Sequence, residues 1–489
     1  MNCKGGESLT NFPLTSDQMV SIIRNGLRKT QFSKKVVIVG AGMAGLTAVS
    51  LLKDAGHHVT IIEANDRIGG RAYTLRSPFS DGLYLNAGPL RIPNIHHLTL
   101  AYIRKFNLPV NEFINETPND IIYANGIITK QSIYKNNPDI LNYPVTLNEK
   151  GKTSDELLDQ ALQPFIDFIN QNPLTNWEIV EKRYGHISFG TFLNSYFSTG
   201  AVDMIGVLLD FEAFMGMSFL EVLREQVAFK SATKFYEITG GMDLLPKSFL
   251  PHLKDHILLN QKLTKIIQNG KFVTIQSTDK KTSNQFTRSA DLAIIAIPFS
   301  LLRFVDIEPF HSISYNKRKA IREINYMSAT KIGIEFKSRF WERYGQFGGK
   351  STTDFPSRLT LYPSIGIGTT GRAVVNASYT WADEALTLSS LTEEERIQYT
   401  LKDMSKIWGN QVYSEFITGT SFNWSQNSFS VGAFTFFEPG QEEELNSYIA
   451  SPEGRLHFAG EHTSRSHAWI QGAIESGVRA ASEVNDSPV

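Results

Sequence analysis

Apolar residues near the start of the chain fall into two short continuous runs. KKVVIVG (34–40) has four consecutive apolar residues ending at a glycine, and HHVTIIEA (57–64) forms the second run, with the apolar stretch LTAVSLLKDAG between them. Short buried runs flanking a helical stretch are typical of a parallel β–α–β unit. A short amphipathic helix is also predicted over 16–25, with Ser16 as its N-cap and Gly26 as its stop.

Farther along, the spacing of apolar residues changes to three and four, from about 153 to 228, which predicts helices that each bury one face. Strand-like runs return near 258–268, at 291–298 and across 326–380, and the chain ends with RLHFAGEHT and an apolar helix over about 468–484. Because helices interrupt the segments of sheet, we expect domains that are discontinuous in sequence.

Composition limits the classes of function. The 489 residues carry a formal net charge of -1, so nothing favours a nucleic-acid partner or an anionic membrane. No run approaches the roughly 20 apolar residues of a membrane span. The start, MNCKGGESLTNFPLT, lacks the apolar core of a secretory signal, which favours a cytoplasmic protein. Cys3 is the only cysteine, so an internal disulfide or a cysteine-rich metal site is excluded, and no metal is expected.

The first motif that carries chemistry is GAGMAG, from Gly40 to Gly45. Gly40 permits a tight turn, Gly42 lets the backbone approach a pyrophosphate, and Gly45 lets helix and strand pack closely. Glu63 ends the second strand, where a carboxylate accepts hydrogen bonds from an adenosine ribose. This order of elements predicts a dinucleotide site: a strand, the glycine turn, a helix, a second strand and an acidic residue.

A second glycine motif, Gly69-Gly70-Arg71, follows six residues after Glu63. Its glycines let the backbone lie against more of the cofactor phosphate, and Arg71 can form charge-assisted bonds to that phosphate. An ordinary Gly-Gly turn with a solvated arginine is the alternative.

Together, IVGAGMAGLTA…IIEANDRIGGR resembles the FAD-binding signature of the flavin amine oxidase family, and FAGEHT (458–463) resembles the family's late Gly-Glu turn. Within the family the chain is most similar to the L-amino acid oxidases of snake-venom type, and we take it as a bacterial member. The stretches that carry this resemblance are RNGLRKT, NAGPLRIP, GAVDMIG, SATKIG, GGKSTTDFPSR and HAWIQGAIESG. The resemblance extends from about residue 16 to 485.

The resemblance implies an α/β fold with three discontinuous parts. A Rossmann-like FAD-binding domain is expected over 34–72, 238–310 and 450–489. A mixed-sheet substrate-binding domain is expected over 5–25, 73–130 and 318–430, and a helical domain over 131–230. The family also suggests a homodimer. With Cys3 as the only cysteine, a thioether-linked flavin is not expected, so FAD would be bound non-covalently.

The resemblance also implies the site. Arg91 and Tyr379 would hold the carboxylate of the substrate, and Lys331 would hold a water beside flavin N5. The Trp469 indole would pack beside the substrate amine and confine it against the flavin. The Ala468 carbonyl would accept a hydrogen bond from that amine. The residues expected against FAD are Gly40, Gly42, Met43, Ala44, Gly45, Glu63, Ala64, Gly70, Arg71, Gly88, Pro89, Leu90, Arg91, Leu263, Trp424, Gly460, Glu461, Trp469 and Ile470.

The chain departs from its relatives at three positions. Glu225 stands where many carry a histidine proposed as the base, and it has three open interpretations: a base with a raised pKa, a selector for cationic side chains, or a solvated residue. Phe434 replaces a smaller apolar residue and would reshape the side-chain pocket. Ala468 replaces a common glycine and adds one methyl group.

The function implied is oxidation of an L-amino acid by hydride transfer from Cα to flavin N5, followed by hydrolysis to a 2-oxo acid and ammonia, with oxygen reduced to hydrogen peroxide. An amino acid 2-monooxygenase, which gives an amide, and an amine oxidase are the alternatives among enzymes. A non-catalytic member of the fold, such as the prenyl-protein-binding dissociation inhibitors, is the alternative of another class.

Overall fold

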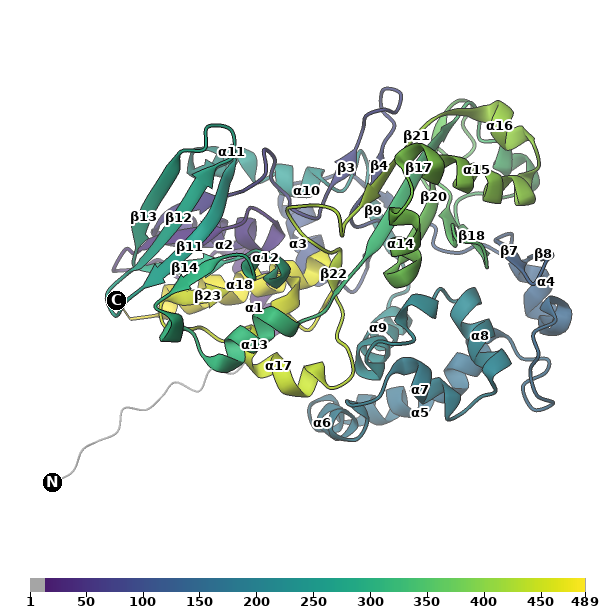
Figure 1. Cartoon of the computed structure of the whole chain (residues 1–489), viewed down its shortest axis with the longest axis horizontal. Coiled ribbons are helices and arrows are strands. Elements are labelled where there is room, and N and C mark those ends of the chain that lie inside the picture. The colour runs from purple at the N-terminus through teal and green to yellow at the C-terminus, as the bar shows by residue number, and fades with distance from the viewer. Residues whose placement is uncertain (1–13, 489) are drawn as a thin grey trace.

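The structure is a computed structural model that describes residues 14–488 (Figure 1). Residues 5–13 of the expected substrate-binding domain, and Cys3, lie outside the described residues. The first described element is α1 (Ser16–Asn25), which confirms the predicted helix and its end at Gly26. Thr15, not Ser16, is its N-cap, because the Thr15 hydroxyl accepts from Gln18 N while the Gln18 side chain accepts from Thr15 N.

A parallel sheet of five strands, in the order β10-β2-β1-β14-β23, confirms the β–α–β unit and the Rossmann-like part of the fold. Its strands are β1 (Lys35–Val39), β2 (His58–Ile62), β10 (Ile257–Leu258), β14 (Leu292–Ile295) and β23 (Leu456–Phe458). The four apolar residues of β1 are all buried, as expected for a central strand covered on both faces.

Helices α2 (Met43–Ala55) and α18 (Ile470–Asp486) pack together on this sheet. They approach closely at Gly477, where an added Cβ would lie 2.5 Å from the Ala44 carbonyl oxygen. Helix α1 packs against α3 (His97–Lys105) and α18, so its buried residues belong to the core of the parallel sheet. Residues 16–25 were expected in the substrate-binding domain; their apolar face instead covers the dinucleotide-binding part.

Beside the parallel sheet lies a smaller sheet in the order β13-β12-β11-β15 (Figure 1). Its strands are β11 (Gln261–Gln268), β12 (Val273–Asp279), β13 (Gln285–Ala290) and β15 (Asp306–Glu308). The Glu63 carbonyl accepts from Gln261 N at 2.8 Å, which joins the start of β11 to the end of β2. Leu263 on β11 is thereby brought to the carboxyl end of the parallel sheet.

A mixed sheet of seven strands forms the other lobe, in the order β21-β17-β20-β19-β18-β7-β8. Its strands are β7 (Ile121–Ala124), β8 (Ile127–Lys130), β17 (Ala329–Phe336), β18 (Lys350–Thr353), β19 (Leu359–Leu361), β20 (Ala373–Trp381) and β21 (Phe416–Asn423). All eight residues of β17 are buried. Helices α14 (Ala382–Ser389), α15 (Glu393–Trp408) and α16 (Gln411–Glu415) pack on this sheet, in whose register Lys331 is paired with Tyr379.

Short strand pairs join the lobes. They are β3 (Thr74–Leu75) with β4 (Leu85–Asn86), β9 (Phe235–Ile238) between β5 (Ile92–Pro93) and β6 (Val110–Glu112), and β16 (Tyr326–Met327) with β22 (Phe434–Thr435). The remaining helices on the dinucleotide side include α12 (Phe299–Leu302), α13 (Tyr315–Glu323) and α17 (Gln441–Ile449).

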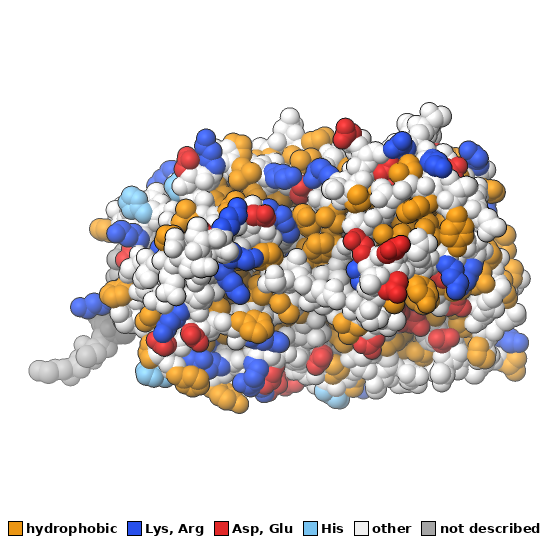
Figure 2. Space-filling view, turned by 45° about the horizontal axis from the view of Figure 1, so that its top comes forward, with side chains coloured by type: hydrophobic (Ala, Val, Ile, Leu, Met, Phe, Trp, Pro, Cys, Tyr) orange, Lys and Arg blue, Asp and Glu red, His pale blue; other side chains and the backbone are white. Residues whose placement is uncertain are grey.

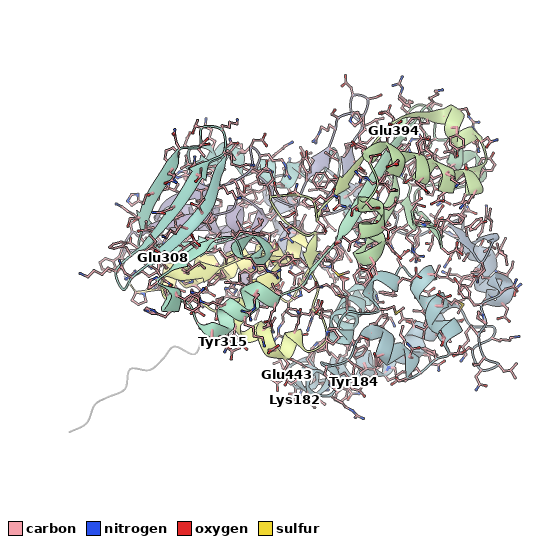
Figure 3. The ribbon with its side chains drawn as sticks, in the orientation of Figure 1. Lys182, Tyr184, Glu308, Tyr315, Glu394 and Glu443 are labelled. Carbon is pink, nitrogen blue, oxygen red and sulfur yellow. The ribbon has the colours of Figure 1, made fainter. Side chains whose placement is uncertain are left out.

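The predicted helical insertion is confirmed. It comprises α4 (Gln131–Asn136), α5 (Ser154–Gln171), α6 (Pro173–Tyr184), α7 (Phe189–Asn194), α8 (Thr199–Leu208) and α9 (Phe219–Ser231). Aromatic rings fill its core; Phe192 and Phe219 stack with centroids 4.0 Å apart. Where α6 ends, Gly440 N donates to Gly185 O at 2.8 Å, and Figure 3 shows Lys182, Tyr184 and Glu443 at this junction with α17.

Acidic and basic side chains are interspersed on the face shown in Figure 2, in keeping with a formal net charge of -1. Within residues 14–488, no helix has the length and apolar character needed to cross a bilayer.

We predict that Gly477→Ala destabilises the protein by about 2–3 kcal/mol, because the new methyl group meets backbone of α2 that cannot move aside. Thermal unfolding of the cofactor-free protein would measure the effect. Gly270→Ala is the matched control, since its Cβ would meet nothing within 4 Å. Equal unfolding temperatures of the two variants would contradict the close packing of α2 on α18.

Candidate active site

A cavity of about 490 Å³ lies at the carboxyl ends of the parallel strands. The ends of β1 and β2 form one wall, and Ala329, Tyr379 and Trp424 of the mixed-sheet lobe form the opposite wall. Open α/β sheets bind ligands at this edge, and cofactor sites occupy roughly 300–1,000 Å³. The cavity therefore has the place and size of a cofactor and substrate site.

Most of the residues predicted from the sequence border this cavity. They are Gly40, Gly42, Met43, Ala44, Glu63, Ala64, Gly70, Arg71, Gly88, Pro89, Leu263, Tyr379, Trp424, Phe434, Gly460, Glu461, Ala468, Trp469 and Ile470. The predicted residues that do not border it are Gly45, Leu90, Arg91, Glu225 and Lys331.

The two glycine motifs lie side by side. Gly42 and Gly69 form a bridge, and Gly69 N donates to Ala41 O at 2.8 Å. A Cβ added at Gly45 would overlap the Gly40 carbonyl oxygen, so Gly45 serves the packing of α2 on β1 and not the cavity wall. A Cβ at Gly42 would meet nothing within 4 Å and would project into the cavity.

The start of α2 is suited to an anion. Its N-cap is Gly42, and no side chain of the described residues caps it, so the N–H groups of Met43 and Ala44 remain available at the cavity wall. The open space beside Gly42 lies at the same place. A pyrophosphate needs this combination of free N–H donors and close backbone approach, and the residues present fit a dinucleotide.

Glu63 anchors the turn and faces the cavity. Its carboxylate accepts from Ala41 N at 2.7 Å and from Asn65 N at 2.8 Å. Burial raises the pKa of Glu63, while these backbone donors and Arg67 oppose that change. A carboxylate oxygen can accept more than one hydrogen bond, so Glu63 retains capacity for the hydroxyls of a ribose.

Arg67 also borders the cavity and was not predicted from the sequence. Its guanidinium lies 3.7 Å from the ring centroid of Tyr73, and its Nη1 donates to Gly70 O at 2.9 Å. Lys262, Lys280 and Phe429 were missed as well; the Lys280 ammonium lies 3.9 Å from the Phe429 ring centroid. Only the position of Arg67 directly before IGGR offered a signal in the sequence, because Lys280 and Phe429 lie outside the strands and helices and nothing in the strand β11 marks Lys262 as a cavity residue.

Arg71 is held at the cavity wall by Glu461. Arg71 Nη1 donates to Glu461 Oε1 at 2.7 Å and to Ala433 O at 3.1 Å, so a freely solvated Arg71 is ruled out. The Glu461 carboxylate also accepts from Thr435 N at 3.2 Å and from Ala468 N at 3.0 Å. Burial alone would raise the pKa of Glu461, but Arg71 and His467 lower it below the ordinary value.

Arg91 does not border the cavity, but it interacts electrostatically with Tyr379, a residue that does. Its guanidinium is within 5.2 Å of the Phe229 ring and 5.4 Å of the Phe235 ring, and it donates to Asn115 Oδ1. Burial lowers the pKa of Arg91, and the nearby Glu225 opposes that change. Arg91 has no carboxylate partner among the salt bridges of the described residues, which leaves its charge available to an anion.

Lys331 lies behind the wall formed by Gly88. Its Nζ donates to the carbonyl oxygens of Asn86, at 3.1 Å, and Gly88, and it lies 4.2 Å from the Tyr379 ring centroid. The residue is 1% exposed, which excludes a strand-end lysine in solvent. Burial, helped by Arg91, holds the pKa of Lys331 well below its ordinary value.

Glu225 binds the indole that borders the cavity. Trp469 Nε1 donates to Glu225 Oε1 at 2.8 Å. Burial raises the pKa of Glu225 to about 7, although Trp469 and Arg91 oppose the change. A hydrogen-bonded, partly buried carboxyl does not fit the solvated interpretation.

Ala468 adopts a left-handed backbone with φ 65°, which explains why glycine suits this position. For alanine such a conformation costs about 1–2 kcal/mol. Phe434 borders the cavity from β22 and packs toward Phe436 of the helical core, with centroids 6.4 Å apart.

Leu90 does not approach the cavity wall, contrary to the expectation that it contacts FAD. It packs with Phe113, Leu359 and Leu361 and borders a separate, smaller cavity of about 110 Å³. Leu90 therefore faces this second cavity and its apolar neighbours, while Gly88 and Pro89 border the main cavity.

Solved structures share the fold of this chain. Putrescine oxidase bound to putrescine matches 93% of this chain and 99% of its own chain with a TM-score of 0.75 and 19% identity. Cyclohexylamine oxidase from Brevibacterium oxydans gives the same values. At this identity the likeness shows the flavin amine oxidase fold.

Sequence comparison is more specific. The chain is 62% identical over 475 residues to YobN of Bacillus subtilis (strain 168), a protein provisionally named an L-amino-acid oxidase, covering 97% of this chain and 99% of that protein. It is 38% identical to the L-amino-acid oxidase of Siganus canaliculatus and 37% to that of Pseudechis australis, covering 96% of this chain and 88% and 90% of theirs.

A family model for flavin containing amine oxidoreductases matches residues 43–485, and one for pyridine nucleotide-disulphide oxidoreductases matches residues 7–78. The first match covers most of the chain and all residues that border the cavity except Val39, Gly40 and Gly42, which precede it. The chain therefore belongs to the flavin-containing amine oxidoreductase family and is a flavin-dependent oxidoreductase.

Proposed function

We propose that the protein uses non-covalently bound FAD to oxidise the α-amine of L-amino acids, giving a 2-oxo acid and ammonia and reducing oxygen to hydrogen peroxide. Two observations carry the proposal. One is the dinucleotide cavity, and the other is Arg91, which interacts with the cavity residue Tyr379 and has no carboxylate partner among the salt bridges of the described residues. When bound, FAD supplies the redox chemistry, accepting a hydride and passing electrons to oxygen.

The cofactor would be held by groups of both glycine motifs. The N–H groups of Met43 and Ala44 would donate to the pyrophosphate, Glu63 would accept from the ribose, and Arg67 and Arg71 would supply positive charge. Cys3 is the only cysteine and is remote in sequence from the Gly460–Glu461 turn, which favours a flavin without a thioether bond.

Arg91 and Tyr379 would hold the substrate carboxylate. A guanidinium fork matches a carboxylate in two parallel hydrogen bonds, and the Tyr379 hydroxyl can donate a third. Phe229 and Phe235 flank the guanidinium and keep water from it, which strengthens the ion pair. The clamp orients Cα, and orientation of this kind can supply several kcal/mol of the reduction in barrier.

Among the two interpretations of Glu225 that remain, we favour the base. The α-hydrogen leaves as hydride only from the neutral amine, because the nitrogen lone pair stabilises the developing iminium. A carboxylate with a pKa of about 7 is matched to removing that proton near neutral pH. Lys331 would hold the water that hydrolyses the imine, and the Ala468 carbonyl and Trp469 indole would lie beside the amine.

A homodimer and a cytoplasmic location also remain proposals. The first rests on the family resemblance and the second on composition. Size-exclusion chromatography with light scattering would decide the first.

We predict that Gly42→Ala folds normally but binds FAD at least about tenfold more weakly, since its methyl group projects into the cavity without meeting protein atoms. Quenching of FAD fluorescence on addition of the cofactor-free protein measures the affinity. Gly45→Ala is the contrasting control: its methyl group overlaps the Gly40 carbonyl, so this variant should fail to fold. Unchanged FAD affinity in Gly42→Ala would argue against a pyrophosphate at this turn.

Mixing the anaerobic enzyme with L- and D-amino acids should bleach the flavin absorbance with L-amino acids only. Arg91→Ala should lower kcat/KM on the order of 100-fold, about 3 kcal/mol, through loss of the charge-assisted clamp. Arg91→Lys tests whether two parallel hydrogen bonds to the carboxylate are needed, because lysine keeps the positive charge but lacks the forked guanidinium. An amide product would indicate a monooxygenase, bleaching by amines alone an amine oxidase, and a colourless protein that FAD cannot restore a non-catalytic member of the fold.

The kcat/KM of the wild type should rise with pH and level off above an inflection near 7, because Glu225 accepts a proton only as the carboxylate and burial raises its pKa to about 7. Glu225→Gln should remove this inflection and lower kcat/KM about 10²-fold or more for all L-amino acids. If the loss is confined to lysine and arginine, Glu225 is a selector for cationic side chains and not the base.

A further inference from the structure

Three consecutive residues beside the cavity, 467–469, are each held by a carboxylate. His467 Nδ1 lies 3.1 Å from both carboxylate oxygens of Glu221. Ala468 N donates to Glu461, and Trp469 Nε1 donates to Glu225. Glu221 and Glu225 are four residues apart on α9, so they project from one face of that helix. Helix α9 therefore binds the turn on both sides of Ala468, through His467 and through Trp469.

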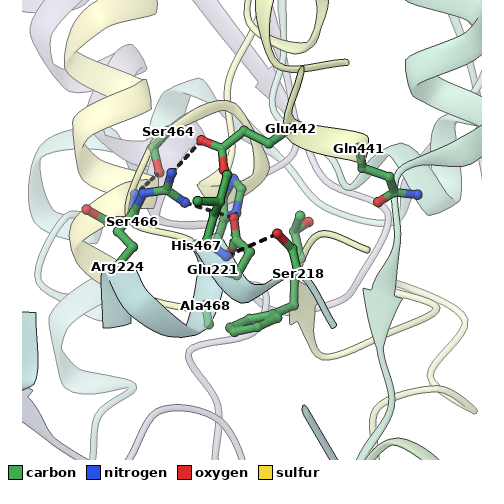
Figure 4. Close-up of polar contacts among 12 residues, drawn as sticks. Ser218, Glu221, Arg224, Gln441, Glu442, Ser464, Ser466, His467 and Ala468 are labelled. Carbon is green, nitrogen blue, oxygen red and sulfur yellow. Dashed lines mark hydrogen bonds and ion pairs between the residues drawn. The ribbon is translucent and has the colours of Figure 1, made fainter. Parts of the chain in front are cut away.

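The Glu221–His467 contact is a buried ion pair within a larger network. The two side chains are 3% and 4% exposed. Arg224 donates to Glu221 at 3.0 Å and also to Glu442 of α17, as Figure 4 shows. Buried charges are tolerated only when they are paired, and breaking such a pair leaves an uncompensated charge. Glu221 therefore requires its two cationic partners.

The charged groups around His467 favour its protonated form. Glu221 faces it from α9, Glu461 from the preceding turn, and Glu475 from α18. Arg224 opposes them, and His462 remains neutral because burial lowers its pKa to about 3. Burial alone would lower the pKa of His467, but Glu221 raises it above the ordinary value, and the pKa of Glu221 is correspondingly lowered.

The turn needs such an anchor, because Ala468 holds an unfavourable left-handed backbone and Trp469 follows it into the cavity wall. We propose that the Glu221–His467 ion pair is a positioning device that fixes the 467–469 turn against α9. It thereby holds the Ala468 carbonyl and the Trp469 indole in place for the substrate amine. This inference rests on the proposed function, because that function defines the substrate amine beside which the turn is positioned. His467 acts through Ala468 and Trp469 and does not contact the substrate.

The chain offers a matched control in His457. Its Nδ1 lies 2.9 Å from Glu483 Oε2, so it too forms a largely buried histidine–glutamate pair. Neither residue borders the cavity. A variant of His457 removes a comparable pair without reaching the turn.

The test compares His467→Asn, His467→Leu, Glu221→Gln and His457→Asn as FAD-loaded enzymes. The asparagine amide nitrogen lies close to the position of Nδ1 and can still donate to Glu221, whereas leucine leaves Glu221 without that donor. We expect kcat to fall about tenfold or more in His467→Leu, with KM changed less than about threefold, and to fall less in His467→Asn. Combining Glu221→Gln with His467→Leu should cost no more than the larger single effect. His457→Asn should change only the unfolding temperature.

Two readouts do not depend on turnover. The visible circular dichroism of the flavin without substrate should change in His467→Leu and not in His457→Asn, because Trp469 borders the cofactor cavity. In the cofactor-free protein, the stability that His467 contributes should be fully present below its unfolded pKa of about 6.5 and should disappear as pH rises through its raised folded pKa. The unfolding temperatures of the wild type and His467→Leu should therefore converge at high pH.

Several outcomes would overturn the positioning role. They are a leucine variant as active as the asparagine variant, kinetic losses that add in the double variant, and a flavin spectrum unchanged in both His467→Leu and Glu221→Gln. If His467→Leu does not fold, Glu221→Gln and His467→Asn carry the same comparison. A wild type that no amino acid bleaches would contradict the proposed function, yet the flavin spectrum would still report on the turn.

Discussion

The buried Glu461 carboxylate is the interaction on which the rest of the site depends. Its oxygens accept from Arg71, from Thr435 N on β22 and from Ala468 N. These partners come from the second glycine motif, from the strand that carries Phe434, and from the turn before α18. A buried anion must be paired with cations or hydrogen-bond donors. Because the donors to Glu461 come from three segments, its carboxylate holds three parts of the cavity wall together. Arg71 is therefore both a lining residue and the counter-ion that allows the walls to meet.

The two lobes position their site residues in different ways. The dinucleotide side relies on backbone, with glycines that let α2 lie against β1 and leave N–H groups free. The mixed sheet relies on register, which sets Lys331 opposite Tyr379 and buries the lysine so that its pKa falls well below the ordinary value. Strands and helices hold side chains more rigidly than loops, which suits a site whose reacting atoms must be aligned.

The helical insertion adds a third element through α9. Glu221 and Glu225, one turn apart, bind residues on either side of Ala468, and Arg224 between them joins α9 to Glu442. Phe229 on the same helix lies beside Arg91. Helix α9 of the insertion therefore contacts both parts of the proposed substrate site. These are Arg91, proposed to bind the substrate carboxylate, and the 467–469 turn, proposed to lie beside the substrate amine.

Much of this could be predicted from the sequence where the signal is local. The β–α–β unit, the role of Gly45 in packing and the helical insertion follow from spacing and from the absence of side chains at glycines, which do not depend on distant residues. Arg91, Tyr379 and Lys331 came only from the family resemblance, because single residues of these types carry no pattern. Thr15 replaced Ser16 as the cap because which hydroxyl reaches the helix N–H groups depends on the entry of the chain.

By itself, then, the sequence determined the order of elements, the dinucleotide turn and the membership of its family. Only the tertiary structure decided that α1 covers the parallel sheet, that Leu90 turns away from the cavity and that Arg67 reaches it. It also decided that His467 and Trp469 meet the same face of α9 and that Arg91 has no carboxylate partner among the salt bridges of residues 14–488. These facts depend on which distant segments share a buried space. Burial and pairing set the charge of a side chain, and neither is encoded by its neighbours along the chain.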